Sequence, residues 1–187
     1  MYEPKDFSHL LGTAGFSDTL LKNHFTLYQG YVTNTNKLID ILKTTEVGTP
    51  AYNELRRRFG WEWNGMRLHE LYFGNMKSGG NNLEDGELKK VLEYIWGSVE
   101  NWKKDFIGTG AMRGIGWAIL TYDKEKKMIF NTWVNEHDEG HLAGAVPLLV
   151  MDVFEHAYIT DYGIKRADYI ESFFKSIDWS VVESRLS

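Results

Sequence analysis

The sequence predicts an α+β protein: an N-terminal helical hairpin followed by a C-terminal domain with a three-stranded antiparallel sheet and flanking helices. Two long stretches with apolar residues at helical spacing fill the first part of the chain. Short stretches rich in β-forming residues, framed by further helical patterns, occupy the rest. A run of small and polar residues at positions 78–82 separates the two patterns. We therefore expect two domains, residues 1–78 and 79–187.

The first domain is expected to consist of two helices. Ser17 and Asp18, residue types that favour a helix start, precede a periodic run over residues 19–42. Gly48 and Pro50 break this pattern. A second helical region covers residues 51–76, with an interruption expected at Gly60.

The second domain begins with helical patterns over residues 83–97 and 99–106. Residues 116–122 and 128–134 are rich in β-forming residues and flank a polar turn, which predicts a hairpin. After a polar, glycine-containing loop, the apolar run 146–153 predicts a buried strand. Helical segments from residue 155 to 186 close the chain.

Composition limits the possible functions. The 21 basic and 26 acidic residues give a net charge of −5 without a basic tract, which argues against a nucleic-acid partner. The chain has no cysteine, so any metal must be bound by histidine and carboxylate side chains. No segment has the pattern of a signal peptide or a membrane span. We therefore expect a cytoplasmic enzyme with no membrane partner.

Asp152 is the first candidate site residue. It ends an apolar strand, where a buried carboxylate is costly unless it is paired, hydrogen-bonded or bound to a metal. His156 follows four residues later, so both side chains can converge on one ion if the chain turns into a helix there. A simple helix cap at Asp152 is equally compatible with this spacing.

Two further histidines have aromatic neighbours. His69 lies in a helical segment flanked by aromatic residues, and is either a ligand or a core histidine bonded to a backbone carbonyl. His24, Tyr28 and Tyr31 are spaced i, i+4, i+7 and share one helical face. That face either lines a pocket or forms an aromatic core stripe.

Together these segments resemble the iron/manganese superoxide dismutases over nearly the whole chain. Four motifs occur in the family's order: Tyr-Val-Thr-Asn from Tyr31, His-Glu-Leu-Tyr-Phe-Gly-Asn from His69, Gly-Ile-Gly-Trp from Gly114, and Asp-Val-Phe-Glu-His-Ala-Tyr from Asp152. The last is very close to the family's Asp-x-Trp-Glu-His-Ala-Tyr motif.

The resemblance implies one iron or manganese ion per subunit, bound by His24, His69, Asp152 and His156 with solvent as a fifth ligand. Histidine and carboxylate side chains suit either metal. The implied reaction is superoxide dismutation, in which the ion cycles by one electron and converts superoxide to dioxygen and hydrogen peroxide. Tyr31 resembles the residue at the mouth of the substrate funnel.

The resemblance also implies the surroundings of the ion. Trp117, Phe73 and Phe154 resemble its aromatic shell, with Phe154 standing where the family often has tryptophan. Glu155 resembles the residue that reaches His156 of the partner subunit. A homodimer or tetramer is therefore expected, with both residues at the interface.

The chain departs from the family's pattern at three positions. One residue fewer than usual separates His24 from Tyr31, and Ile159 replaces a tyrosine at the expected interface. Iron members commonly place a glutamine on the second helix, four residues before the ligand, as donor to the bound solvent. This chain has Gly65 there, which leaves a space that a loop residue is expected to fill.

The candidate for that donor is His137, in the loop before the Asp152 strand, with His141 as the weaker substitute. The sequence is also compatible with both being exposed loop residues. A histidine in this place resembles the iron or metal-tolerant members, and such outer residues tune the metal's potential, so we expect iron rather than manganese.

Two other functions are compatible with the ligand set. Histidine and carboxylate side chains also hold zinc for hydrolysis or ferrous iron for oxygen activation. A family-like, catalytically silent metal-binding structural protein is the other alternative. Metal analysis, a visible absorption spectrum and a superoxide assay separate these functions.

Overall fold

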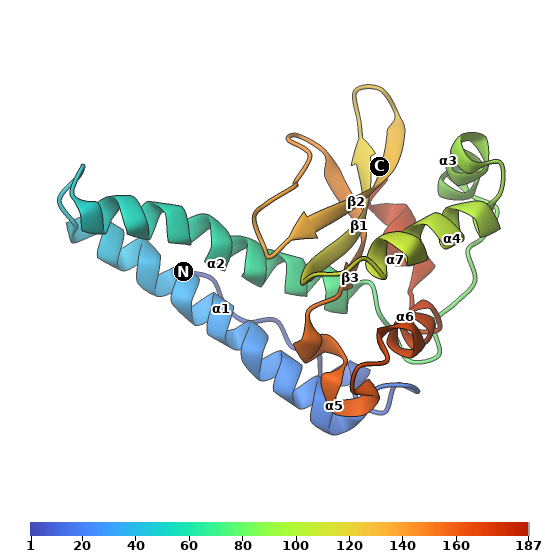
Figure 1. Cartoon of the computed structure of the whole chain (residues 1–187), viewed down its shortest axis with the longest axis horizontal. Coiled ribbons are helices and arrows are strands. Elements are labelled where there is room, and N and C mark those ends of the chain that lie inside the picture. The colour runs from blue at the N-terminus through green and yellow to red at the C-terminus, as the bar shows by residue number, and fades with distance from the viewer. Residues whose placement is uncertain (187) are drawn as a thin grey trace.

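Two long helices form the N-terminal part of the computed structural model, which describes residues 1–186. Helix α1 (Asp18–Thr44) and helix α2 (Pro50–Gly74) pack as a hairpin whose closed end extends away from the rest of the molecule (Figure 1). Ser17 and Thr49 cap them, each accepting a hydrogen bond from a backbone N–H of the first turn. The expected interruption at Gly60 is wrong, because packing holds the flanking turns and one glycine costs a helix only about 1 kcal/mol.

A three-stranded antiparallel sheet forms the centre of the C-terminal part. Its strands are β1 (Gly116–Asp123), β2 (Met128–Asn135) and β3 (Val146–Asp152), in the order β2-β1-β3. Strand β1 is therefore central, and β3 is an edge strand. Trp117 of β1 pairs with Asp152 of β3, which brings two of the predicted site segments side by side.

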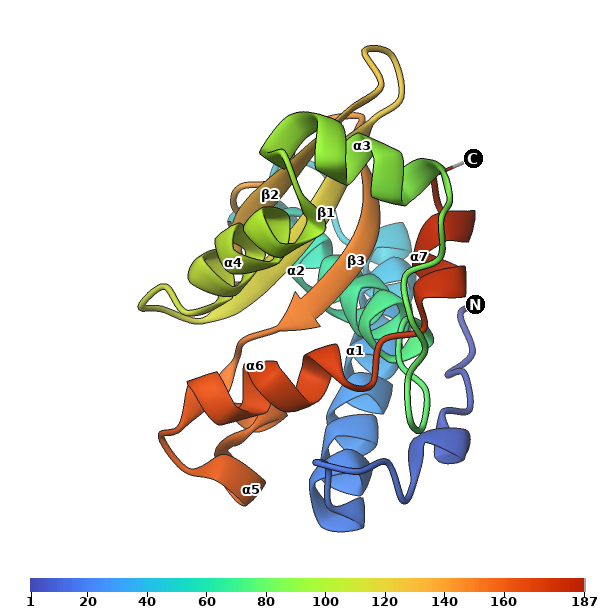
Figure 2. The same ribbon diagram turned by 90° about the vertical axis from the view of Figure 1, so that its right-hand side faces the viewer.

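Helices cover the sheet. Helices α3 (Glu87–Trp96) and α4 (Val99–Gly110) lie in front of it in Figure 2, with α1 and α2 on the far side. The final segments are short: η2 (Glu155–Ala157), α5 (Ile159–Tyr162), α6 (Arg166–Phe174) and α7 (Trp179–Ser184). This arrangement confirms the expected α+β fold.

One apolar core joins the two parts of the chain. Side chains from α1, α2, all three strands and the C-terminal helices belong to a single buried cluster. The core crosses the expected boundary at residue 78, so the division into two domains stays a prediction. Within residues 1–186, no helix is long and apolar enough to cross a membrane.

Candidate metal centre

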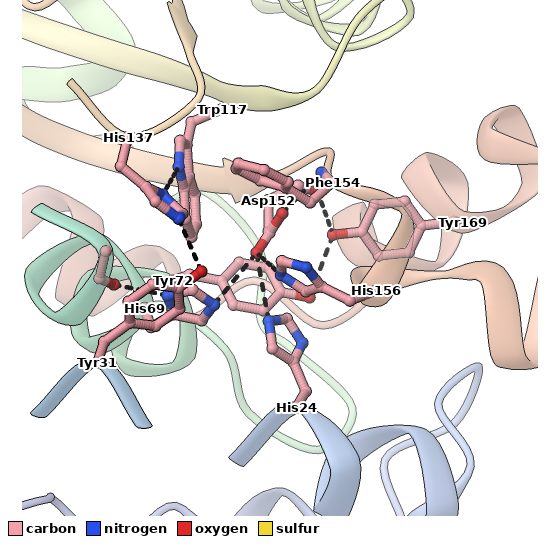
Figure 3. Close-up of polar contacts among 11 residues, drawn as sticks. His24, Tyr31, His69, Tyr72, Trp117, His137, Asp152, Phe154, His156 and Tyr169 are labelled. Carbon is pink, nitrogen blue, oxygen red and sulfur yellow. Dashed lines mark hydrogen bonds and ion pairs between the residues drawn. The ribbon is translucent and has the colours of Figure 1, made fainter. Parts of the chain in front are cut away.

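Four side chains from separate parts of the fold meet at one point. His24 comes from α1, His69 from α2, Asp152 from the end of β3, and His156 from η2 (Figure 3). One donor atom of each residue lies within 4.8 Å of the others, and all but His156 are fully buried. The structure thus brings the four predicted ligands together, while their role as ligands stays a prediction.

The separations within this cluster suit a single ion. Atom Oδ2 of Asp152 lies 3.2 Å from Nε2 of His24, 3.6 Å from Nε2 of His69 and 3.0 Å from Nε2 of His156. Two ligand atoms that each lie roughly 2.1 Å from one ion are about 3.0 to 3.6 Å apart when the angle at the ion is about 90 to 120°. Among the described residues, no other group of histidine and acidic side chains converges in this way.

The buried histidine nitrogens also fit a metal ion. Nδ1–H of His69 donates to the Gly65 carbonyl at 2.6 Å, which leaves the lone pair of Nε2 facing the cluster. Nε2 of His69 and Nε2 of His24 are buried without a hydrogen-bond partner in the part of the chain that the structure describes. Leaving such an atom unpaired costs about 1 to 3 kcal/mol. A metal ion at the cluster would satisfy both Nε2 atoms, whereas Nδ1 of His24, which also has no partner among the described residues, would be left unpaired.

The protonation states suit metal binding as well. Burial lowers the pKa of His24 and lowers the pKa of His69 well below its ordinary value. Burial alone would raise the pKa of Asp152, but its interactions with His156 and His24 outweigh this and hold that pKa well below the usual range. At neutral pH His24 and His69 are therefore neutral imidazoles and Asp152 is an ionised carboxylate, the forms that bind metal ions.

Tyr31, His137 and Trp117 form a hydrogen-bonded chain beside the cluster (Figure 3). Nε1–H of Trp117 donates to Nδ1 of His137 at 3.1 Å, so the neutral ring of His137 carries its proton on Nε2. That Nε2–H in turn donates to the Tyr31 hydroxyl oxygen at 2.9 Å. Burial lowers the pKa of His137 to about 4 and raises the pKa of Tyr31, which keeps the ring neutral and the phenol protonated at neutral pH.

The ring of Tyr31 lies against Gly65. A Cβ atom at Gly65 would lie 2.7 Å from Cδ1 of Tyr31, so the close approach requires glycine. The same ring stacks on His69 with 5.1 Å between ring centroids. The expectation that a loop residue fills this space is wrong: the close packing of α1 on α2 puts Tyr31 there, and His137 reaches Tyr31 from the loop.

Aromatic rings surround the four side chains. Phe73 packs on His24 and Trp117 on His69, with centroids 4.8 and 5.0 Å apart, while Phe154 stacks on His156 at 5.1 Å. They supply an apolar surrounding that keeps bulk water from most of the cluster.

The remaining predicted residues lie farther from the centre. Nε2 of His141 lies 2.9 Å from the His137 carbonyl, so this histidine braces the loop rather than facing the cluster. Tyr28 bonds to Glu70 at 3.1 Å and is buried between α1 and α2. Glu155 is exposed next to His156.

Sequence reasoning missed Tyr169, which contacts the centre through the backbone. Its hydroxyl donates to the Asp152 carbonyl at 2.6 Å, and its oxygen lies 3.1 Å from the hydroxyl of Tyr72. It also missed Trp61, whose ring lies 4.5 Å from that of His137. Both residues lie in ordinary helical patterns, so no local signal distinguishes them from other core aromatics.

Comparison with known proteins decides the family. Residues 84–185 match the family model of the iron/manganese superoxide dismutases, C-terminal domain. This chain belongs to the iron/manganese superoxide dismutases.

Relatives named as superoxide dismutases match most of the chain. The protein named superoxide dismutase (Fe) from Cupriavidus metallidurans is 35% identical, covering 92% of this chain and 89% of its own length. Another of that name, from Aquifex pyrophilus, is 34% identical over 98% of this chain and 90% of its own length. The superoxide dismutase (Mn) of Haloarcula marismortui is 36% identical, covering 84% and 78%. This chain is thus similar both to relatives named as iron enzymes and to relatives named as manganese enzymes.

Proposed function

We propose that this protein is a superoxide dismutase in which His24, His69, Asp152 and His156 hold one iron or manganese ion. The observation that carries the proposal is the convergence of these four donors in a member of the family. A bound ion of either metal supplies the one-electron exchange with superoxide. The carboxylate of Asp152 would partly neutralise such an ion, and the net positive charge that remained would favour approach of the superoxide anion.

Tyr31 and His137 are proposed to handle protons. A superoxide that gains an electron must also gain protons to leave as hydrogen peroxide. Because the Tyr31 oxygen accepts from Nε2–H of His137, the Tyr31 hydroxyl keeps its own proton for another acceptor. Its raised pKa keeps that proton on the phenol until an acceptor arrives. His137 orients the phenol: its one N–H is used on Tyr31, so direct donation to bound solvent, which stays a prediction, would require that hydrogen bond to break or to be shared.

Iron is the metal we propose. The support is the position of the proposed donor: His137 approaches from the loop, whereas α2 has Gly65 in place of a glutamine. Relatives of both metal types match this chain, so the choice depends on measurement.

A homodimer, or a tetramer built from it, is proposed around Glu155 and His156. Glu155 is exposed, and the side chain of His156 is 27% exposed although its neighbours in the cluster are buried. Apolar side chains that line the same surface hollow as Glu155 are exposed, with Met112 at 48%, Ile159 at 49% and Ile164 at 97%. A second copy would cover these side chains and let its Glu155 reach the histidine.

The proposal is tested by metal analysis combined with a superoxide-consumption assay. We expect one ion per chain in the purified protein and higher turnover after reconstitution with iron than with manganese. Asp152→Ala should lose both metal and activity. An ion bound without superoxide consumption would indicate a silent metal-binding protein, and zinc as the resident metal would indicate another enzyme class. A cytoplasmic location belongs to the same proposal and is tested by cell fractionation.

A further inference from the structure

The outer edge of strand β3 is closed by side chains instead of another strand. Exposed strand edges leave backbone groups unpaired, and buried ones must find partners. On β3, alternate carbonyls accept hydrogen bonds from three different side chains: Leu148 from Arg185 at 2.6 Å, Val150 from Asn75 at 3.3 Å, and Asp152 from Tyr169 at 2.6 Å. The strand that carries Asp152 is therefore held along its edge by side chains from the C-cap of α2, from α6 and from the C-cap of α7.

Arg185 connects this edge to helix α2. Its Nη1 donates to the Leu148 carbonyl and lies 3.2 Å from Oδ1 of Asn75, and its Nη2 donates to the Leu71 carbonyl at 3.0 Å. Burial lowers its pKa to about 10, so the group is still a cation at neutral pH. No acidic side chain within residues 1–186 forms an ion pair with Arg185. Its charge instead faces the C-terminal end of α2, where the helix dipole is negative.

Glu183, two residues before Arg185, has the opposite charge and contacts a different helix. Glu183 of α7 accepts a hydrogen bond from the Leu88 N–H at 3.2 Å, at the N-terminus of α3. The residue at the cap position, Gly86, has no side chain to do this. Glu183 thus stabilises a helix that carries none of the four proposed ligands, whereas Arg185 contacts two elements that do.

The contacts of Arg185 lie close to two of the ligands along the chain. Leu71 is two residues from His69 on α2, and Leu148 is four residues from Asp152 on β3. Asn75 ties the same two elements together, because its Oδ1 also accepts from the Val150 N–H at 2.9 Å. We propose that Arg185 is a positioning residue of the metal centre, which holds His69 and Asp152 at the separation that one ion requires. This inference rests on the proposed metal site.

The test compares release of manganese from reconstituted wild type, Arg185→Met and Glu183→Gln. Release to a chelator is followed well below the unfolding temperature, and the melting temperature of each metal-free protein is measured separately. We expect Arg185→Met to release manganese roughly 10-fold faster, the lower end for residues that orient ligands. Glu183→Gln should lower the melting temperature of the metal-free protein but leave the release rate unchanged.

Arg185→Lys is the second variant. Lysine keeps the charge but lacks the fork that donates to two carbonyls at once, so its release should also be faster. Arg185→Lys replaces Arg185→Met in the comparison if Arg185→Met does not fold. Wild-type release rates in the folded arginine variants, or equal acceleration in Glu183→Gln, would overturn the inference. Failure of the wild type to bind either iron or manganese would instead overturn the proposed metal centre.

Discussion

At the scale of single residues, the metal centre depends on which ring nitrogen carries a proton. The Gly65 carbonyl holds the proton of His69 on Nδ1, and Trp117 holds that of His137 on Nε2. Each contact fixes the state of the opposite nitrogen. Nε2 of His69 faces the ligand cluster with a free lone pair, and Nε2–H of His137 donates to Tyr31. Backbone and indole partners therefore set the chemistry of both histidines.

His137→Ala should separate metal binding from turnover. The variant keeps the four proposed ligands, so we expect metal content near that of wild type. Turnover should fall by roughly 10- to 100-fold, because the Tyr31 oxygen loses the donor that orients it. Metal analysis and superoxide consumption measured on the same sample check both expectations.

His141→Ala is the control for that experiment. Its ring contacts only the His137 carbonyl among the hydrogen bonds of the described loop, so activity should stay close to wild type. Loss of activity in His141→Ala with full activity in His137→Ala would show that His141, not His137, has the proton-handling role. Full activity in both would remove the proton-handling role from this loop.

At the scale of helices and strands, the closeness of α1 to α2 decides what each helical glycine does. Gly65 faces the Tyr31 ring, whereas an added Cβ at Gly30 would meet no atom within 4 Å. Glycine inside a helix otherwise costs about 0.5 to 1 kcal/mol relative to alanine. The same substitution should therefore have opposite effects at the two positions.

Gly65→Ala should destabilise the protein and displace Tyr31, because the new Cβ would lie 2.7 Å from a ring carbon. Gly30→Ala should raise the free energy of unfolding by up to about 1 kcal/mol with little change in turnover. Urea denaturation and superoxide consumption measure the two effects. A stable, fully active Gly65→Ala protein would contradict the need for this close approach.

At the scale of the whole molecule, the buried histidines couple stability to pH. Burial lowers the pKa of His24 and of His69, and lowers that of His137 from 6.5 to about 4. These groups stay neutral in the folded protein while the unfolded chain takes up protons. The folded state therefore loses stability as the pH falls below the pKa that these histidines have in the unfolded chain. For His137 the loss ends near its pKa in the folded protein, about 4.

Metal-free protein should accordingly unfold at lower urea concentration as the pH falls from 6.5 towards about 4. The midpoint should vary little between about pH 7.5 and 8.5, where these histidines are neutral in both states. His137→Ala should show a shallower decrease because one of the groups is gone. A urea midpoint of the metal-free wild type that does not change between pH 6.5 and about 4 would contradict this prediction.

Assembly is the other prediction for the whole molecule. Glu155→Ala should shift the proposed dimer towards monomer and reduce turnover, because the carboxylate is expected to reach His156 of the partner subunit. Sedimentation velocity and superoxide consumption at matched concentrations measure both effects. Glu171→Ala is the control and should remain like wild type, because Glu171 is exposed on α6 and its ion pair within residues 1–186 is with Lys175 at 3.7 Å. A fully active monomer would refute the proposed interface.

The order of helices and strands could be predicted because it depends on local patterns. Helical and alternating periodicities, caps and turns involve residues near one another in the chain, and the observed elements follow them closely. The spacing of residues could not predict the convergence of His24 and His69 with Asp152, because it was equally compatible with histidines that simply pack in the core. It followed from the motifs that resemble the family.

Sequence alone therefore determined the fold class, the family and the four residues that meet at the centre. Only the tertiary structure decided that Tyr31 packs on Gly65, that Tyr169 holds the Asp152 carbonyl, and that Arg185 spans α2 and β3. The partners in these contacts lie far apart in the chain, and several are backbone carbonyls that every residue possesses. No side-chain pattern marks such a carbonyl as a partner until folding brings the two groups together.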